Sequence, residues 1–222
     1  MASLVLTLHS KTPELRKIKK ITEAMNEGAV VLYPTDTGFT LGCELSNKNA
    51  IEKIRAIRRI SEAKSMTFLT DSLSNLSLFA KVSNSAYRVI NALIPGPYTF
   101  ILPASKLVPK FAQNPKRKTA GLRVPDNRLC RALLTELGSP IISISAKMDG
   151  IDGKTDPEAV LDAFISIVDV AVRSDEYNFQ GESTIIDMTN DDKFSILRAG
   201  AGYDLVENFM TIDEQEIGRA HV

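Results

Sequence analysis

The stretch GAVVLYPTDTGFTLG, from Gly28 to Gly42, decides how this chain is interpreted. An apolar, β-branched run reaches a proline and then changes into threonines and an aspartate, followed by Gly38 and Gly42. A strand that ends in hydroxyls, a carboxylate and small residues can present side-chain oxygens and backbone N–H groups to a ligand. The segment is therefore a candidate binding loop, although a tight turn with internally satisfied polar residues explains the same pattern.

Strand-like and helix-like runs alternate outward from this stretch along the chain. The expected strands are Leu4–Leu8, Ala29–Tyr33, Met66–Thr70, Thr99–Leu102, Ala120–Val124, Ile141–Ser145, Ile167–Val172, Thr184–Asp187 and Phe194–Arg198. The expected helices are Thr12–Glu27, Lys48–Ile60, Ser83–Leu93, Asn127–Leu137 and Asp156–Phe164. Asp156 followed by Pro157 is a typical helix start, and Gly138 is a typical helix stop. Interleaved elements of this kind predict the α/β class with a twisted, mixed sheet.

The 222 residues are expected to form one domain over residues 1–211 and a tail over 212–222. The last seven residues, EIGRAHV at 216–222, resemble a translated sequencing adapter, so we expect them not to be native; an ordinary tail is the alternative. No apolar run approaches the roughly 20 residues that span a bilayer. The N-terminus lacks the basic segment of a signal peptide. A cytoplasmic location without membrane association is expected.

Histidine and cysteine usage excludes several classes of chemistry. The two histidines are His9 and His221, neither of which is placed to serve a Ser-His-Asp or Cys-His mechanism. The two cysteines, Cys43 and Cys130, form neither a CxxC pair nor a disulfide framework, and a structural zinc site lacks ligands. Any catalysis must therefore rest on Arg, Lys, Ser, Thr and Asp side chains.

Charge is unevenly distributed along a chain with 27 basic and 27 acidic residues. Residues 106–131 hold eight cations and one acid, whereas residues 149–192 hold twelve acids and two cations. This asymmetry suggests a positive face that binds phosphates or nucleic acid. Two separate solvated surfaces of opposite sign are the alternative.

Two segments combine turn residues with cations or hydroxyls. RAIRRISEAKS, residues 55–65, supplies Arg55, Arg58, Arg59 and Lys64 near the end of a helix, where they suit phosphate or carboxylate binding. Exposed cations that compensate the helix dipole are the alternative. PGPYTF, residues 95–100, makes a rigid entry into a strand, and its role is interpreted as structural, positioning Thr99.

Three further segments place polar side chains on strands. In KRKTAGLRVP, residues 116–125, Arg123 lies inside an apolar strand and needs an anion, either an internal aspartate or a ligand phosphate. In PIISISAK, residues 140–147, Ser143 and Ser145 point the same way, opposite the isoleucines, and Lys147 follows with the same parity. Arg198 precedes a glycine-rich turn that either closes over a nucleotide or simply ends the strand.

In this order and at these spacings, the segments resemble the YrdC/YciO family. YPTDTGFTLG, PGPYTFIL, KTAGLRVP, SISA and LRAG carry the resemblance, which extends from about Ala24 to Gly202. It implies a single domain with a twisted mixed sheet, flanking helices and a basic concave face. It also implies an activity like that of threonylcarbamoyl-AMP synthases, which condense L-threonine, bicarbonate and ATP, release pyrophosphate, and serve threonylcarbamoyladenosine formation on tRNA. The alternative implied by the family is a non-catalytic protein that binds double-stranded RNA, tRNA or rRNA.

The resemblance also assigns roles to residues. The catalytic set is Arg58, Lys64 and Ser145; the set for threonine and its carbamate is Thr35, Ser143 and Arg123; the nucleotide set is Thr119, Arg123, Ser145 and Arg198. Mg²⁺ is expected to arrive with ATP, with no metal held by protein side chains alone. In the RNA-binding alternative the contacts come from Lys116, Arg117 and Lys118.

Two positions depart from the synthase pattern. Ile60 stands where synthases carry an arginine, with Arg59 as the neighbouring cation, and Lys147 stands where they carry an asparagine. Lysine has no acceptor, so it cannot reproduce the hydrogen bonds of asparagine. These departures make the chain resemble the YciO branch most closely, and they predict weak synthase activity or a different substrate.

Overall fold

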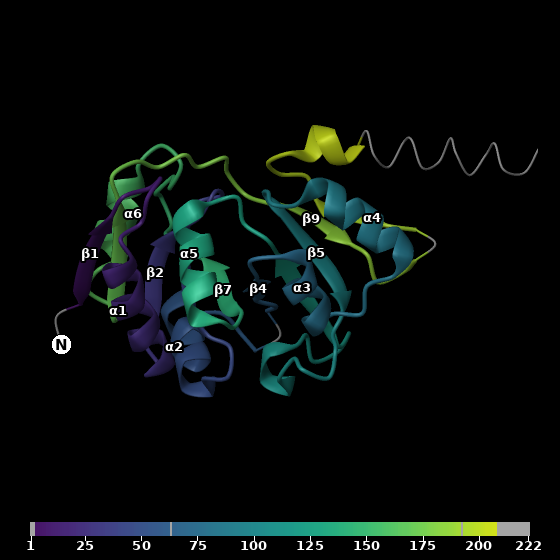
Figure 1. The fold of residues 1–222 in the computed structure, drawn as a ribbon, viewed down its shortest axis with the longest axis horizontal. Helices are drawn as coiled ribbons and strands as arrows, with labels where there is room; N and C mark the ends of the chain where they lie inside the picture. Colours follow the sequence, from purple (N-terminus) through teal and green to yellow (C-terminus); the bar gives the residue numbers. More distant parts are fainter. Residues whose placement is uncertain (1–2, 63, 192, 208–222) are drawn as a thin grey trace, which may run out of the picture.

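The structure is a computed structural model that describes residues 3–62, 64–191 and 193–207 (Figure 1). Its strands are β1 (Leu4–Leu8), β2 (Val31–Pro34), β3 (Phe39–Glu44), β4 (Thr67–Leu69), β5 (Tyr98–Pro103), β6 (Thr119–Arg123), β7 (Ile141–Ser145), β8 (Val170–Ser174), β9 (Thr184–Asp187) and β10 (Ser195–Arg198). Its helices are α1 (Leu15–Asn26), α2 (Lys48–Arg58), α3 (Leu73–Phe79), α4 (Asn84–Leu93), α5 (Arg128–Leu137) and α6 (Pro157–Phe164), with a 3₁₀ turn at Lys110–Ala112.

All ten strands belong to one sheet, in the order β1-β8-β2-β3-β7-β4-β6-β5-β9-β10. β8 runs parallel to both β1 and β2, and parallel pairs also join β4 to β6 and β5 to β9. The remaining neighbours are antiparallel. The predicted α/β fold with a mixed sheet is therefore confirmed.

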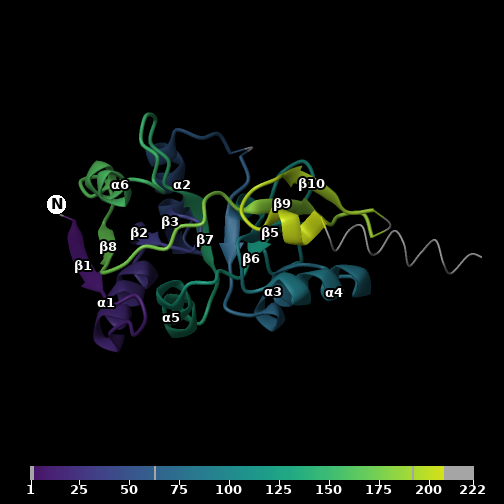
Figure 2. The same ribbon diagram turned by 90° about the horizontal axis from the view of Figure 1, so that it is seen from above.

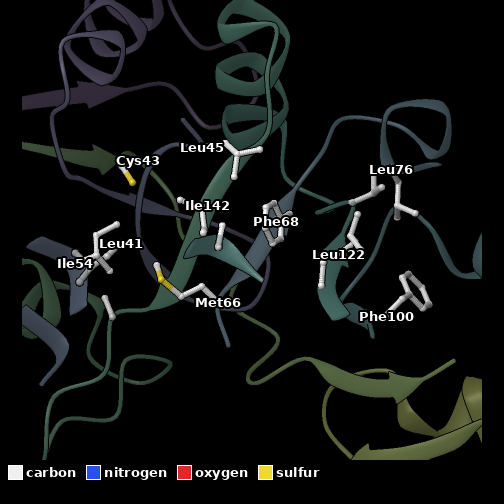
Figure 3. Close-up of a cluster of buried hydrophobic side chains, with 14 of the residues drawn as sticks. Leu41, Cys43, Leu45, Ile54, Met66, Phe68, Leu76, Phe100, Leu122 and Ile142 are labelled. Atoms are coloured by element: carbon white, nitrogen blue, oxygen red, sulfur yellow. The ribbon is translucent and has the colours of Figure 1, made fainter. Parts of the chain in front are cut away.

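Helices cover both faces of the sheet, and two apolar clusters form between the layers. Figure 2 shows α1 and α5 on one side and α2 and α6 on the other. Ile18, Ile21 and Met25 of α1 pack with α5, β1 and β8 in the smaller cluster. The larger cluster includes Ile54, Phe68 and Ile142, which Figure 3 shows among its buried side chains. Burial on both faces fixes the strand register, because a slip by one residue would exchange the faces.

Side-chain caps explain where several helices begin. The side-chain oxygens of Asn47, Asn127 and Asp156 accept hydrogen bonds from the first backbone N–H groups of α2, α5 and α6. Pro157 occupies the first turn of α6, and Gly138 ends α5 with a φ of 67°. Both boundary predictions at Asp156 and Gly138 are confirmed.

Strand β3 was not predicted, because its glycine was interpreted as part of a loop. Gly42 lies inside β3, opposite Val31 of β2. A Cβ at this position would lie 2.8 Å from the Tyr33 ring and 2.7 Å from Ile141, so only glycine lets these side chains cross the strand. The chain therefore makes a hairpin at residues 35–38 and returns along the sheet. Helix α3 was also missed; it begins where the Ser72 hydroxyl accepts from the Asn75 N–H.

Two other expectations concern the ends of the chain and membranes. The predicted tail at 212–222, with its adapter-like residues 216–222, lies outside the described residues and stays a prediction. Within residues 3–62, 64–191 and 193–207, no helix combines the length and the apolar character needed to cross a membrane.

Candidate functional site

An open cavity of about 620 Å³ lies where the middle of the sheet meets the loop at residues 146–154. Strands β3 to β7, β9 and β10 contribute to its lining, together with the C-terminal end of α2. Figure 2 shows β7, β4 and β6 between the half that carries α2 and α6 and the half that carries β9 and β10. The cavity therefore draws side chains from both halves of the molecule.

Most of the residues assigned by resemblance meet in this cavity. Its lining includes Arg58, Lys64, Arg123, Ser143, Ser145 and Arg198, as well as Lys147. Thr35, Thr119, Lys116, Arg117 and Lys118 do not line it. Thr119 is buried at the far end of β6, where it pairs with Pro103.

The serines of β7 lie as strand alternation predicts. Ile142 and Ile144 pack with the larger apolar cluster, and Ser143 and Ser145 line the cavity, which Ile144 also reaches. The Ser143 hydroxyl is buried and donates to the Thr67 carbonyl at 3.2 Å, while Ser145 is exposed. Ser145 is therefore the more accessible hydroxyl for a ligand.

Thr35 is used inside the hairpin turn. Its hydroxyl donates to the Gly38 carbonyl at 2.9 Å and accepts from the Thr37 N–H at 3.2 Å, and the residue is 1% exposed. Thr37 lines the cavity in its place. The Thr35 hydroxyl therefore stabilises the turn, and Thr37 is the threonine of this segment that a ligand in the cavity could contact. The sequence Thr-Asp-Thr offered both threonines as candidates.

Arg123 has an internal anion. It forms a buried ion pair with Asp36, and its guanidinium also donates to the Thr37 hydroxyl at 2.6 Å and to the Gly96 carbonyl at 3.4 Å. Of the two anions expected for Arg123, the structure shows the internal aspartate. Arg123 also lines the cavity. Through its contacts with Asp36 and Thr37, it fixes the turn beside the cavity.

The cations at the end of α2 have different roles, contrary to the expectation that they form one anion-binding group. Arg55 is buried and donates to the carbonyls of Ser61 at 2.7 Å and Lys64 at 3.2 Å, so it holds the loop after the helix. Arg58 lines the cavity and donates to the Lys147 carbonyl. Burial lowers the pKa of Arg58, with Asp149 acting in the opposite direction.

Arg59 does not replace the arginine missing at Ile60. Arg59 ends α2 in the left-handed region with a φ of 50° and is exposed away from the cavity lining. Ile60 also lies outside the lining. The helix end therefore contributes Arg58 to the cavity, and the next cation is Lys64.

Glu182 is a site residue that the sequence did not indicate. It pairs with Lys147 and, at 3.1 Å, with Arg198. Arg198 also donates to the Ser183 carbonyl at 2.9 Å and to its hydroxyl at 3.0 Å, and burial lowers the Arg198 pKa. No motif marked Glu182, because it belongs to a long acid-rich stretch in which one carboxylate resembles another.

The cavity lining has an excess of cations but is not uniformly basic. It contains the cations Arg58, Lys64, Arg123, Lys147, Lys154 and Arg198 and the acids Asp149, Asp152 and Glu182. Of the eight cations at residues 106–131, all of them described, Arg123 alone belongs to this lining. The cavity therefore takes one cation from the cation-rich segment, and it also takes Asp149, Asp152 and Glu182 from the acid-rich segment.

The predicted RNA-binding lysines lie on a turn between β5 and β6. The Asn114 side chain accepts from the N–H groups of Lys116 and Arg117, which shapes this turn. Arg117 pairs with Asp187 at 2.7 Å. Burial raises the pKa of Asp187, but hydrogen bonds from Thr189 and Arg117 outweigh it and leave the pKa lowered. Lys116 and Lys118 are exposed.

The sequence of this fold matches a known protein family. A family model named for Sua5, YciO and YrdC, and described as telomere recombination, matches residues 23–200. The chain belongs to this family. The match spans the whole cavity from Thr37 to Arg198, and it confirms the resemblance indicated by the motifs.

Members of the Sua5/YciO/YrdC family resemble the chain over most of its length. It is 39% identical to Escherichia coli YciO over 196 residues, or 88% of this chain and 94% of YciO. The crystal structure of that protein matches at 38% identity with a TM-score of 0.84, covering 90% of this chain and 97% of YciO. Threonylcarbamoyl-AMP synthase of Hydrogenovibrio crunogenus is 31% identical over 154 residues, or 68% of this chain and 82% of the synthase.

A third likeness within the Sua5/YciO/YrdC family concerns a liganded structure. P. abyssi Sua5 complexed with L-threonine matches at 26% identity with a TM-score of 0.81, covering 89% of this chain and 58% of Sua5. Together with YciO, it shares the single α/β domain with a mixed sheet described above.

Proposed function

We propose that this chain binds ATP, L-threonine and bicarbonate in its central cavity and condenses them into threonylcarbamoyl-AMP with release of pyrophosphate. The product would serve threonylcarbamoyladenosine formation on tRNA. The observation that carries the proposal is the convergence of Arg58, Lys64, Ser145 and Arg198 on one cavity. Its relatives include a named threonylcarbamoyl-AMP synthase and a Sua5 complexed with L-threonine, which supports the same substrates here.

The chemistry suits a cavity that offers cations and hydroxyls. The carbamate of threonine is a weak nucleophile, and the α-phosphate that it attacks is highly anionic. Positioning the two groups and neutralising the developing charge would therefore supply most of the rate enhancement. In this proposal Arg58, Lys64 and Arg198 face phosphate oxygens, while Ser145 and Thr37 hold the carbamate and the amino acid.

Mg²⁺ enters as part of the ATP substrate. Among the described residues, no group of three or more His, Cys, Asp or Glu side chains is arranged to hold a metal ion. We therefore assign its coordination chiefly to phosphate oxygens and water, since Mg²⁺ dehydrates reluctantly and commonly binds through substrate phosphates.

The test is pyrophosphate release with ATP, magnesium, bicarbonate and L-threonine, each omitted in turn. Lys64→Ala removes an exposed cavity cation and is expected to lower the rate by about tenfold or more, because the charge of the phosphates is then less well neutralised. Lys81→Ala removes the same charge from an exposed site outside the cavity and should keep the wild-type rate. Release that does not depend on threonine and bicarbonate would contradict the proposal.

RNA binding is a second candidate, favoured by the exposed lysines at 116 and 118. A double variant, Lys116→Ala with Lys118→Ala, should make the salt dependence of double-stranded RNA binding shallower by about one unit of logarithmic slope per lysine. The control is the double variant Lys19→Ala with Lys20→Ala, which removes the same charge from two exposed lysines on α1. Equal slopes for the two double variants would exclude a specific role for the turn.

A further inference from the structure

One carboxylate of the protein holds two of the cavity's cations. Glu182 precedes β9, and its oxygens pair with Lys147 and with Arg198, the latter at 3.1 Å. Lys147 follows β7, whereas Arg198 ends β10, so the carboxylate joins distant strands of the sheet. These two cations are therefore directed at an anion that belongs to the chain itself.

The surroundings of Lys147 are rich in positive charge. Its pKa is lowered, first by burial and then by Arg198, Arg58 and Lys64. Cations gathered in this way repel one another unless an anion lies among them. Glu182 supplies a single negative charge to the group, so cationic character remains for a ligand to neutralise.

The backbone at Glu182 is fixed while its side chain has room to leave. The Glu182 carbonyl accepts from the Ala201 N–H at 2.7 Å, and Gly200 lies so close that a Cβ there would meet the Glu182 carbonyl and lie 2.7 Å from the Ser183 carbonyl. In contrast, the Glu182 side chain is 44% exposed. Rotation about its own bonds would release both cations without disturbing the sheet.

We propose that Glu182 occupies an anion subsite formed by Lys147 and Arg198, and that a ligand with two or more phosphate groups displaces its carboxylate on binding. This inference rests on the proposed function and adds a competing group of the protein to the nucleotide's site. Several charges are needed because the ligand must replace a tethered carboxylate. Arg58 and Lys64 line the same cavity and would bind a second phosphate group of the ligand. A ligand with a single carboxylate would bind weakly here, because it would only replace one carboxylate by another.

The experiment measures pyrophosphate affinity by titration calorimetry at fixed ionic strength, without threonine or bicarbonate. Glu182→Gln is expected to tighten binding by about tenfold, since a like charge at close range then no longer opposes the ligand. Asp149→Asn is the matched control, because it removes the same charge from the same cavity; it should tighten binding by only about twofold, because this exposed carboxylate favours the charge of Arg58 and does not occupy the subsite of Lys147 and Arg198. Adding Lys147→Met to Glu182→Gln should cancel the gain.

Two results would overturn the inference. Equal tightening by Glu182→Gln and Asp149→Asn would show that only the net charge of the cavity matters. Unchanged, weaker or absent pyrophosphate binding in Glu182→Gln would show that its carboxylate does not compete. Selective tightening in a protein that fails the pyrophosphate-release assay would support this inference while removing the proposed reaction.

Discussion

At the residue scale, Asp36 and Arg123 link the core to the cavity wall. Their side chains are 3% and 7% exposed, and the guanidinium also binds the Thr37 hydroxyl. Such a pair is costly to bury, and removing one partner leaves an uncompensated charge. From the sequence, Arg123 needs an anion that is either an internal aspartate or a ligand phosphate, because strand parity does not reveal which loop crosses the strand.

Replacing Asp36 tests this linkage. Asp36→Asn should lower the free energy of unfolding by about 3–5 kcal/mol, because Arg123 would stay buried without its counter-charge. Urea denaturation gives this value. Glu176→Gln alters an exposed pair with Lys11 at 3.7 Å and should change stability by less than about 1 kcal/mol. An unfolding midpoint for Asp36→Asn equal to that of the wild type would show that the pair contributes nothing.

At the scale of elements, glycines decide where backbone segments approach each other. Gly42 allows β3 to pass the Tyr33 ring, and Gly200 allows the end of β10 to meet the segment before β9. The sequence indicated strands β1, β7 and β9 with their exact bounds, because these short runs are rich in aliphatic residues and contain no glycine or proline. It missed β3, because a glycine within a strand has the same signature as a turn.

Gly200→Ala should destabilise the protein by about 1–3 kcal/mol, because the new methyl group would press on the backbone of Glu182 and Ser183. Thermal unfolding is the measurement. Gly153→Ala is the control, since its Cβ would lie 3.1 Å from the Val160 side chain, which can move more readily than backbone. Equal losses in melting temperature for the two variants would contradict a special role for the contact at Gly200.

At the scale of the whole molecule, one cavity gathers residues from Thr37 to Arg198. The motifs and the resemblance that they carry pointed to six residues of this lining, because each motif marks the end of an element or a turn that reaches the same region: Arg58, Lys64, Arg123, Ser143, Ser145 and Arg198. The acids of the lining were not predictable, because Asp149, Asp152 and Glu182 belong to an acid-rich stretch without a distinctive pattern. Their place depends on the three-dimensional path of the loop at 146–154 and of the segment before β9.

The position of β8 has a consequence for synthesis on the ribosome. Leu4 of β1 pairs with Val170 of β8, and Val31 of β2 pairs with the same residue from the other side. At typical translation rates of about 5–20 residues per second, β8 emerges on the order of ten seconds after β1. Throughout that interval β1 lacks its neighbour in the sheet, so its backbone N–H and C=O groups stay unpaired on the nascent chain. They are paired only when β8 has been synthesised.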